Sequence, residues 1–422
     1  MKEYLKQIKS KKLHFRNPTD FSRNRTFTFE TVFHLILDLP RLSLSIEIEK
    51  ELPKINKLLG RNESGTKSGF SKARDKIEPE LFIELNDFLV EKFNEKERLK
   101  WKGYVLKAID GSIMDVTKTK ENIEEFGIHS GVVQGRMVIC YDVLNKIITN
   151  AELGKISQGE NSFAKKWVKE KKSNELIIYD RLYPGMVLQY YHFCYGSKYL
   201  MRCKSSHNKM IKAFVKSEEK DVVIDWPLSK ESIKELRLAD IECSNKTTIP
   251  VRMIKVELES EETEILITSL TDQKKYPHKI FKELYFKRWG VETNIGFLKN
   301  TLQIELSSGQ RSKFIYQNFH ATILRCNIQQ LIEQDCILKV KKKNKKRKYR
   351  YAINKTVAAG NLKGNLYQLF LLKNPEKHYE KLIEIFMKNL EPIRPNRKFP
   401  RKRKKMKTSG KYRPLKNYKR AM

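Results

Sequence analysis

The first hundred residues carry apolar side chains at helical spacing. The pattern predicts helices in 28–59, with a break near Pro40, and again in 70–93. The polar stretch GRNESGTKSG at 60–69 separates them as a loop. Two helices joined by a polar turn fit a DNA-reading helix-turn-helix element, and they fit an ordinary helical hairpin equally well.

From Tyr104 the pattern changes to short apolar runs typical of β-strands. Runs at 104–109, 137–143 and 146–153 predict three strands, and Asn145 between the last two indicates a hairpin. A helix is expected over 162–173, followed by a buried strand in ELIIYD, 175–180. Strands interleaved with helices predict an α/β fold in which helices cover a sheet.

Residues 191–275 again read as strands, and we expect a β-rich insertion there with little helix. A long helix is then expected over 277–303. The resulting organisation is a helical N-terminal DNA-binding domain, the first part of an α/β core, a β-rich insertion, the second part of the core and a basic helical C-terminal region. The corresponding ranges are 1–100, 101–190, 191–275, 276–335 and 336–422.

Charge points to a polyanionic partner. Lys and Arg total 86 against 50 Asp and Glu, a formal net charge of +36, and such an excess attracts nucleic acid through its phosphates. The basic runs 340–351 and 396–420 are expected to lack fixed structure until they contact phosphate. A solvated tail, or a basic ribosome-associated protein, would carry the same charge.

The sequence also indicates where in the cell the protein is expected. Apolar stretches are too short to cross a membrane, and the N-terminus lacks the apolar core of a signal peptide, so we expect a cytoplasmic protein without a membrane partner. The six cysteines are scattered and form no C-x-x-C pair, which supports neither a zinc site nor a disulfide framework.

Candidate chemistry begins with a stripe on the predicted helix 277–303. Tyr285, Arg288, Glu292 and Lys299 project within a sector of roughly 60° if the helix is continuous. The apolar residues of the same segment fall on a neighbouring sector, so the stripe would lie at the rim of the buried face. A solvated helix face with an ordinary Arg288–Glu292 ion pair would show the same spacing.

Two aspartates strengthen the functional interpretation of this stripe. Asp110 and Asp180 each end an apolar strand, where ligands bind in α/β sheets. Together with Glu292 they could hold two divalent cations for in-line phosphoryl displacement, and oxygen ligands suit Mg²⁺ or Mn²⁺. Aspartate at a strand end is also a common turn residue. Other carboxylates and histidines to which we assign a structural rather than a metal-binding role are Asp115, Asp142, Asp225, His129 and His192.

The stripe and the two aspartates resemble a known family. Tyr285-x2-Arg288-x3-Glu292-x6-Lys299 resembles the YREK signature of bacterial DDE transposases of the insertion-sequence-four type. Asp110 in IDGS and Asp180 in IIYDRLYPG resemble their first two acids, although Leu182 stands where the family usually has glycine. GFSKARDKI at 69–77 and Asn327 also match, so that the resemblance covers about 60–330.

This resemblance implies a ribonuclease-H-like core interrupted by the β-rich insertion, and a DNA transposase that cleaves the ends of an insertion sequence and joins them to target DNA. Asp110, Asp180 and Glu292 would hold two Mg²⁺ or Mn²⁺ ions. Tyr285, Arg288 and Lys299 would contact phosphates, and Trp289 would stack on an unpaired base or pack in the core. The implied partners are double-stranded DNA and a second copy of the chain, as a homodimer on DNA.

Three other functions remain open from the sequence. A catalytically inactive DNA-binding relative would need no trio of acids. Another metal-dependent DNA nuclease would use the same core without strand transfer. A basic RNA-associated protein would leave Asp110, Asp180 and Glu292 dispersed.

Overall fold

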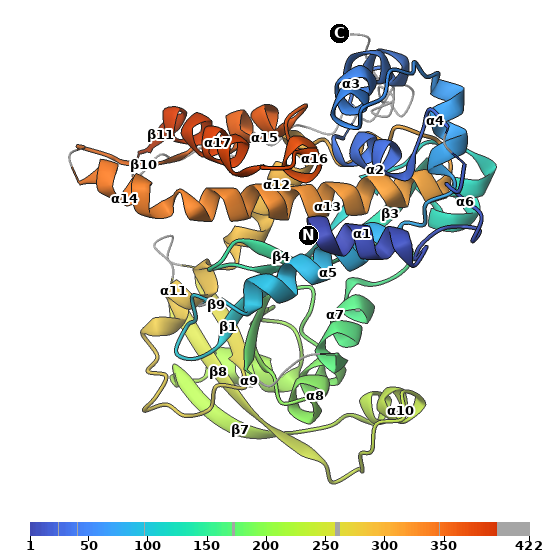
Figure 1. Ribbon diagram of the computed structural model, residues 1–422. Coiled ribbons are helices and arrows are strands. Elements are labelled where there is room, and N and C mark those ends of the chain that lie inside the picture. Colours follow the sequence, from blue (N-terminus) through green and yellow to red (C-terminus); the bar gives the residue numbers. More distant parts are fainter. Residues whose placement is uncertain are drawn as a thin grey trace. The chain divides into compact units, whose positions relative to one another are not determined.

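The chain forms two compact units, each assembled from stretches far apart in the sequence. The computed structural model describes residues 1–23, 25–39, 41–96, 98–170, 174–257, 262–345 and 347–394. Unit 1 comprises Met1–Phe93, Met114–Gln134 and Gly296–Met422, and unit 2 comprises Asn94–Ile113 and Gly135–Ile295. Figure 1 labels the elements of both units.

Unit 1 is mainly helical. Its short strands are β2 (Ile128–His129) and the antiparallel pair β10 (Arg350–Ile353) and β11 (Leu390–Ile393). Its helices are α1 (Lys2–Ser10), α2 (Phe29–Leu37), α3 (Leu44–Leu58), α4 (Lys67–Arg74), α5 (Glu80–Asn94), α6 (Lys120–Phe126), α13 (Ser312–Asp335), α14 (Ile337–Asn344), α15 (Lys355–Leu362), α16 (Gln368–Leu371) and α17 (Glu376–Lys388).

The N-terminal helices follow the sequence prediction with one correction. A break does separate α2 from α3, while Pro40 itself lies outside the described residues. The single helix expected over 70–93 is instead two, α4 and α5. Helix α4 ends at Arg74, and Pro79 lies just before α5, where its missing backbone N–H costs the helix no hydrogen bond. Helix α4 also begins earlier than expected, because the Thr66 side chain accepts a hydrogen bond from the Gly69 N–H.

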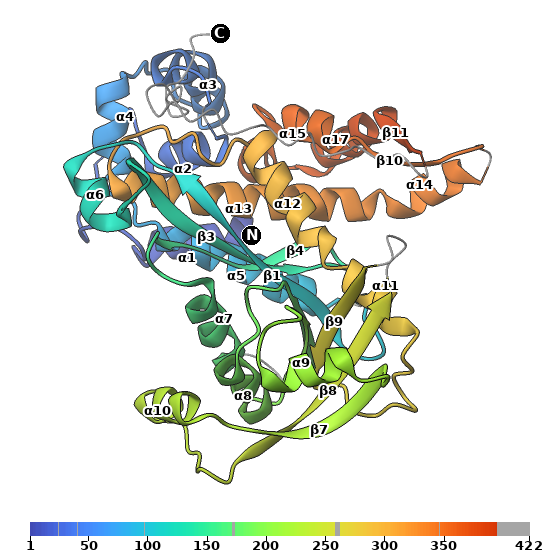
Figure 2. The ribbon, with the colours of Figure 1, turned by 180° about the vertical axis from the view of Figure 1, so that it is seen from behind.

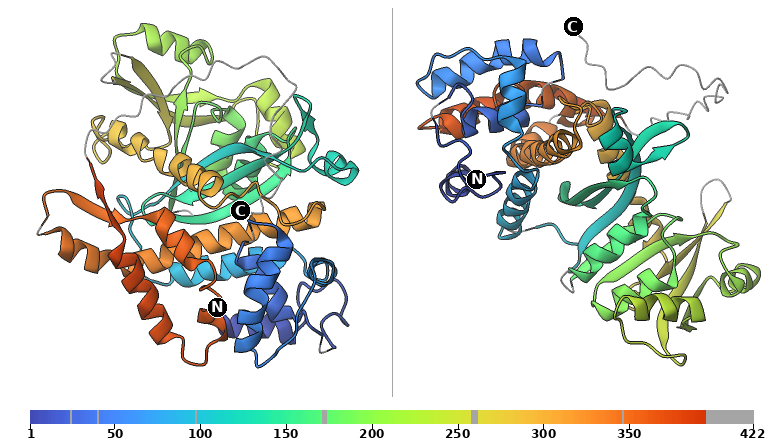
Figure 3. Two further views of the ribbon diagram at one scale, coloured as in Figure 1. Left: turned by 90° about the horizontal axis from the view of Figure 1, so that it is seen from above. Right: turned by 90° about the vertical axis from the view of Figure 1, so that its right-hand side faces the viewer.

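Helix α13 organises the core of unit 1, and α2 and α17 pack against it (Figures 1 and 3). It is 24 residues long and buried along most of its length. Its polar groups are paired inside the unit: Arg325 donates to Asp38 at 3.2 Å, and Asn327 donates to Asn86 at 2.8 Å. A helix enclosed on all sides shows no polar face, which is why the sequence pattern did not predict it.

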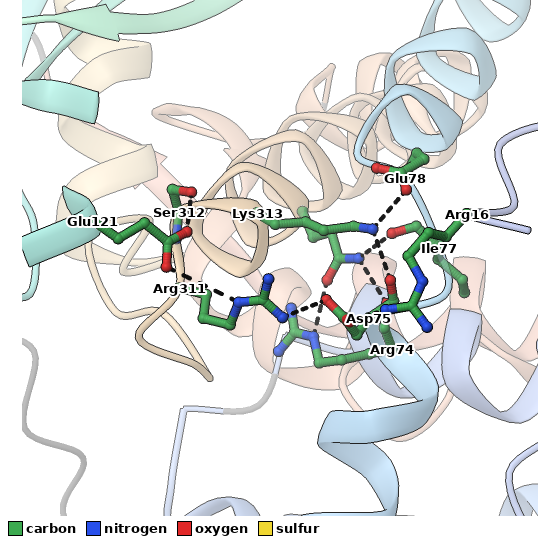
Figure 4. Close-up of polar contacts among 10 residues, drawn as sticks. Arg16, Arg74, Asp75, Ile77, Glu78, Glu121, Arg311, Ser312 and Lys313 are labelled. Atoms are coloured by element: carbon green, nitrogen blue, oxygen red, sulfur yellow. Dashed lines mark hydrogen bonds and ion pairs between the residues drawn. The ribbon is translucent and has the colours of Figure 1, made fainter. Parts of the chain in front are cut away.

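The beginning of α13 is fixed to α4 by a polar network (Figure 4). Arg74 is fully buried and donates to Gln317 at 2.9 Å and to Ser308 at 2.7 Å. Gln317 in turn donates to the backbone carbonyl of Ile77 at 2.6 Å. The 69–77 stretch that carries part of the family resemblance therefore has a structural role in this unit.

Unit 2 contains most of a large mixed sheet, so the predicted α/β class is confirmed. Among the described residues the sheet has nine strands in the order β2-β3-β1-β5-β6-β9-β8-β7, with β4 paired to β3. Its remaining strands are β1 (Val105–Asp115), β3 (Val132–Asp142), β4 (Ile147–Lys155), β5 (Glu175–Tyr179), β6 (Lys198–Cys203), β7 (Asp221–Pro227), β8 (Thr248–Glu257) and β9 (Thr263–Thr268).

Helices pack on this sheet within unit 2. Buried side chains of α7, α8, α9 and α10, whose bounds follow, join those of β1, β3, β5, β6, β8 and β9 in one apolar cluster. Helices α7 and α8 lie side by side (Figures 1 and 2). The helices are α7 (Glu160–Lys169), α8 (Met186–Cys194), α9 (Lys209–Lys216), α10 (Lys230–Leu238), α11 (Ile280–Phe286) and α12 (Trp289–Asn300), whose end belongs to unit 1.

Several predicted elements of unit 2 are confirmed. Strands β3 and β4 form the expected antiparallel hairpin around Asn145. Helix α7 confirms the helix expected over 162–173 as far as Lys169, and residues 171–173 lie outside the described residues. Strand β5 lies parallel to both β1 and β6. Parallel neighbours need a crossover connection, which α7 and α8 provide.

The segment 191–275 is rich in strands as expected, but two helices within it were not expected. Residues 213–216, interpreted as part of a strand, lie in α9, because the Asn208 side chain caps that helix and Ile211 and Phe214 supply its buried face. Helix α10 starts at a Ser229 cap in the same way. Strands β7, β8 and β9 continue the same sheet beyond β6.

The long helix expected over 277–303 is wrong as a single element. Helices α11 and α12 are joined by a tightened turn, in which the Arg288 N–H bonds the Tyr285 carbonyl at 3.0 Å and the Val291 N–H bonds the Arg288 carbonyl at 3.1 Å. Such i→i−3 bonds advance about 120° per residue instead of 100°. Tyr285 therefore does not share one continuous helix face with Glu292 and Lys299.

The basic C-terminal runs differ from the expectation where they can be compared. Within 340–351, residues to Asn344 complete α14 and Arg350 begins β10, so both ends of this run lie in regular structure. The run 396–420 lies outside the described residues. In the part of the chain that is described, no helix is both long and apolar enough to cross a membrane.

Candidate active site

Asp110 lies inside β1, directly after the buried run Val105–Ile109. The expectation that it ends the strand is wrong, because β1 continues to Asp115 with β3 as its neighbour on the side away from β5. The parallel pairing with β5, however, is registered only for Val105–Ala108. Asp110 therefore stands just beyond the β1–β5 ladder, with its side chain half-buried.

Asp180 follows β5 immediately, as predicted. Ala108 is in register with Ile178, so Asp110 and Asp180 each stand two residues beyond the last registered pair of two parallel neighbours. Parallel strands place equivalent positions at one edge of the sheet. The Asp180 Oδ1 accepts the Leu182 N–H at 2.8 Å, which forms a tight turn after the strand.

Glu292 lies in the first turn of α12. Its Oε1 accepts a hydrogen bond from Arg288 Nη2 at 2.6 Å, and the Arg288 side chain is buried while Glu292 is partly exposed. The i,i+4 ion pair considered from the sequence is thus present. It does not isolate Glu292 from the aspartates, because the charge of Glu292 acts on Asp110.

The charges of Asp180 and Glu292 both act on the Asp110 carboxyl. The pKa of the Asp110 carboxyl is raised from 3.8 to about 7, chiefly by burial and also by the negative charges of Asp180 and Glu292, while Arg288 and the Gly111 N–H oppose the shift. Carboxylates that raise one another's pKa favour a bound cation, which would relieve their repulsion. That Asp110, Asp180 and Glu292 together hold divalent cations stays a prediction.

The donor set suits a hard cation, although its geometry is open. Carboxylate oxygens are the ligands that Mg²⁺ and Mn²⁺ prefer. In the described part of the chain, no three His, Cys, Asp or Glu side chains are gathered closely enough to enclose a metal ion. Asp110, Asp180 and Glu292 therefore fit the chemistry of such an ion, and closure around it would require their side chains to approach.

The remaining residues of the predicted stripe differ in exposure. Tyr285 is buried, and burial raises its pKa to about 12. Trp289 is 44% exposed, and Arg288 lies over its ring at 5.5 Å from the centroid. Lys299 belongs to unit 1, where it forms an ion pair with Glu305 at 3.3 Å.

Competing side chains have structural contacts. Asp142 is fully buried, accepts the Asn145 N–H in the β3–β4 turn and pairs with Arg98 at 2.7 Å. Asp115 accepts a hydrogen bond from Gln134 at 2.7 Å. His192 is buried between Tyr179 at 2.9 Å and Ser197 at 2.6 Å.

Sequence reasoning did not identify Glu160, which lies beside the acids. It is the first residue of α7, and its carboxylate contacts the backbone at Gly111 and the hydroxyl of Tyr183. The available signal was the glycine directly after Asp110, since a missing side chain marks a close approach. The partner that approaches it could not be read from spacing.

Comparisons with known proteins identify the family of this chain. The sequence profile described as "Transposase DDE domain" matches residues 101–328, more than half of the 422 residues. Transposase InsG for insertion sequence element IS4, from Escherichia coli (strain K12), is 24% identical over 209 residues. That match covers 48% of this chain and 46% of InsG, so the chain spans about half the length of this relative.

One solved structure is also similar. The cryo-EM structure of the piggyBac transposase synaptic complex with hairpin DNA has a TM-score of 0.44 and 11% identity, covering 90% of this chain and 80% of that chain. The family match alone spans all three acids, from Asp110 to Glu292, and it confirms the family predicted from their motifs. The chain belongs to the transposase DDE-domain family.

Proposed function

We propose that this protein is a DNA transposase of the insertion-sequence-four type, which cleaves the ends of an insertion sequence and joins them to target DNA. The observation that carries the proposal is the position of Asp110 and Asp180 just beyond the parallel β1–β5 ladder, where the charges of Asp180 and Glu292 help to raise the pKa of Asp110. All three acids lie in the part of the chain matched by the DDE-domain family. A protein that only bound DNA would gain nothing from acids that repel one another and the phosphate backbone.

The sheet supports a ribonuclease-H-like core. The hairpin strands β3 and β4, then β1, and then the parallel strands β5 and β6 form the consecutive order β4-β3-β1-β5-β6. This order places Asp110 on the central strand and Asp180 after its parallel neighbour. Strands β7, β8 and β9, with α9 and α10, would correspond to the insertion between the second Asp and the Glu.

The acids would bind metal ions, and neighbouring residues would bind DNA phosphates. Asp110, Asp180 and Glu292 would hold two Mg²⁺ or Mn²⁺ ions. Bound there, such ions would provide Lewis-acid activation of a water or of a DNA 3′ hydroxyl and would stabilise charge on the leaving oxygen. Arg288 lies against Glu292 and bears a planar guanidinium that suits a phosphate beside the cut. Its charge would also limit the repulsion between these acids and DNA.

The other residues of the stripe would contact DNA more weakly or in other ways. The partly exposed Trp289 ring can stack on an unpaired base, and Lys299 can add a point charge once DNA competes with Glu305. Tyr285 would reach a phosphate only after its buried hydroxyl becomes accessible. The net charge of +36 supports double-stranded DNA as the partner. We further propose a homodimer on DNA.

The proposal is tested by replacing Glu292 with Gln and measuring Mg²⁺-dependent cleavage of DNA that carries the terminal sequences flanking the coding region. We expect cleavage to fall by at least about a thousandfold, which corresponds to about 4 kcal/mol in the barrier. Asp225→Asn is the matched control, because Asp225 is an exposed carboxylate in the same unit. Equal cleavage by Glu292→Gln and the control would refute the proposal, and cleavage without joining would identify a nuclease.

A further inference from the structure

Glu160 makes an unusually close approach to the strand that carries Asp110. A Cβ atom added at Gly111 would stand 2.1 Å from Glu160 Cδ and 2.3 Å from its Oε1. Distances this short cannot coexist with a side chain at position 111 unless the carboxylate moves away. The glycine after Asp110 thus makes room for the Glu160 carboxylate against the β1 backbone.

The other contacts of Glu160 lead to Asp180. Its Oε2 accepts the hydroxyl of Tyr183 at 2.8 Å, and Tyr183 closes the turn that follows Asp180, with its N–H 3.4 Å from the Asp180 carbonyl. The Tyr183 ring is buried and packs on Tyr179 of β5 at a centroid distance of 5.1 Å. One carboxylate therefore touches the backbone next to the first acid and the turn next to the second.

Such a position is electrostatically unfavourable for Glu160 unless its neighbours compensate. Arg136 of β3 supplies part of that compensation, since its Nη1 donates to Glu160 Oε1 at 3.2 Å. Tyr183 supplies a neutral donor: burial raises the pKa of its hydroxyl well above the ordinary value, and the charges of Glu160, Asp110 and Asp180 act in the same direction. Tyr183 accordingly keeps its proton and donates a hydrogen bond to Glu160.

We propose that Glu160, through its contact with Gly111 and its hydrogen bond from Tyr183, is a positioning residue that fixes the spacing between Asp110 and Asp180 for cation binding. The inference rests on the proposed function, because it concerns the same acids. Residues that orient ligands from behind them typically change metal affinity 10- to 100-fold when replaced. Glu160 would act through the β1 backbone and the Tyr183 turn.

The test measures Mn²⁺ binding to the full-length, DNA-free protein by isothermal titration calorimetry. We expect Tyr183→Phe and Glu160→Gln each to weaken Mn²⁺ binding about tenfold. Tyr190→Phe and Glu152→Gln are matched controls: Tyr190 loses a hydroxyl bond to the Glu242 carbonyl, and Glu152 loses charged contacts with Lys166, both within unit 2. The melting temperatures of each variant and its control should agree.

A second arm uses the close approach at Gly111. In Gly111→Ala the new methyl group would displace the Glu160 carboxylate from Tyr183, so Mn²⁺ binding should weaken about as much as in Glu160→Ala. Because both changes break one contact, the double variant should bind no more weakly than either single variant. Equal, additive losses would show that Gly111 and Glu160 act separately and would overturn the proposal.

Asp110→Asn separates this inference from the function on which it rests. If Asp110→Asn abolishes Mn²⁺ binding while Tyr183→Phe and Glu160→Gln bind like their controls, the positioning role of Glu160 is wrong and the proposed metal site stands. If Asp110→Asn binds Mn²⁺ like the wild type, the proposed function itself fails.

Discussion

Two charged regions of the molecule differ in how their carboxylates are compensated. In unit 1, at the start of α13, each carboxylate meets a cation: Asp75 pairs with Arg16 and with Arg311 at 2.7 Å, and Glu78 pairs with Lys313 at 2.6 Å (Figure 4). We call this group the α13 cluster. In unit 2 burial and the charges of Asp180 and Glu292 instead raise the pKa of Asp110, against the opposing charge of Arg288.

The difference separates structural from functional charge. In the α13 cluster, paired charges and satisfied hydrogen bonds join elements that are distant in sequence, so replacing them should lower stability. In the acidic site, like charges are held close at a cost in stability, so removing one should raise stability and abolish cation binding. Substitutions in the two regions should thus change the free energy of unfolding in opposite directions.

The largest expected effect is at Arg74, the buried guanidinium behind the α13 cluster. Arg74→Ala removes its hydrogen bonds to Gln317 and Ser308 and leaves these buried groups without their donor. We expect the free energy of unfolding to fall by about 3 kcal/mol, measured by urea denaturation. A loss no larger than that of an exposed substitution such as Lys6→Ala would contradict the structural role of this region.

The next effect has the opposite sign. The Asp110 pKa is about 7 in the folded chain against an ordinary value of 3.8, so between these pH values the folded state binds more protons and stability falls as pH rises. Asp110→Asn should therefore stabilise the metal-free protein by about 2 kcal/mol above pH 7, discounted for partial solvent access, and by nothing below about pH 4. Urea denaturation in EDTA at several pH values measures this. A pH-independent difference would contradict the origin of the shift.

Bound divalent cations should offset the loss of stability that the acidic site causes. A Mn²⁺ concentration ten times the dissociation constant should stabilise the wild type by about 1.4 kcal/mol, visible as a higher melting temperature. Asp110→Asn should show no such shift, while Arg311→Ala in the α13 cluster should keep it. Equal shifts in wild type and Asp110→Asn would place Mn²⁺ binding elsewhere.

The smallest effect is expected at the rim of the α13 cluster. The Arg311 side chain is 55% exposed, so its ion pair with Asp75 is screened by water. Arg311→Ala should change the free energy of unfolding by less than about 1 kcal/mol, and raising the salt concentration should shrink this change. A loss as large as that of Arg74→Ala would show that charge pairing, rather than burial, stabilises the cluster.

The sequence predicted the parts of this site that local patterns determine. Asp110 and Asp180 follow short apolar runs, and such runs form strands wherever they can be buried. Glu292 was found through its spacing from Arg288. The tightened turn between α11 and α12 was missed because nothing in the local pattern distinguishes i→i−3 from i→i−4 bonding there.

Other features depend on contacts between distant residues, which no local pattern contains. Helix α13 is enclosed on all sides, so its polar residues bind partners inside unit 1 and leave no periodic polar face. Glu160 looked like an ordinary first-turn acid of α7, and only its contacts with Gly111 and Tyr183 reveal its place beside the site.

The most direct test of the central claim is to locate Mn²⁺ by anomalous diffraction in crystals of the protein grown with that ion. We expect anomalous density ligated by oxygens of Asp110, Asp180 and Glu292, with the same density absent from crystals of Asp110→Asn. Mn²⁺ bound at full occupancy elsewhere, with none of these three carboxylates as ligands, would contradict it.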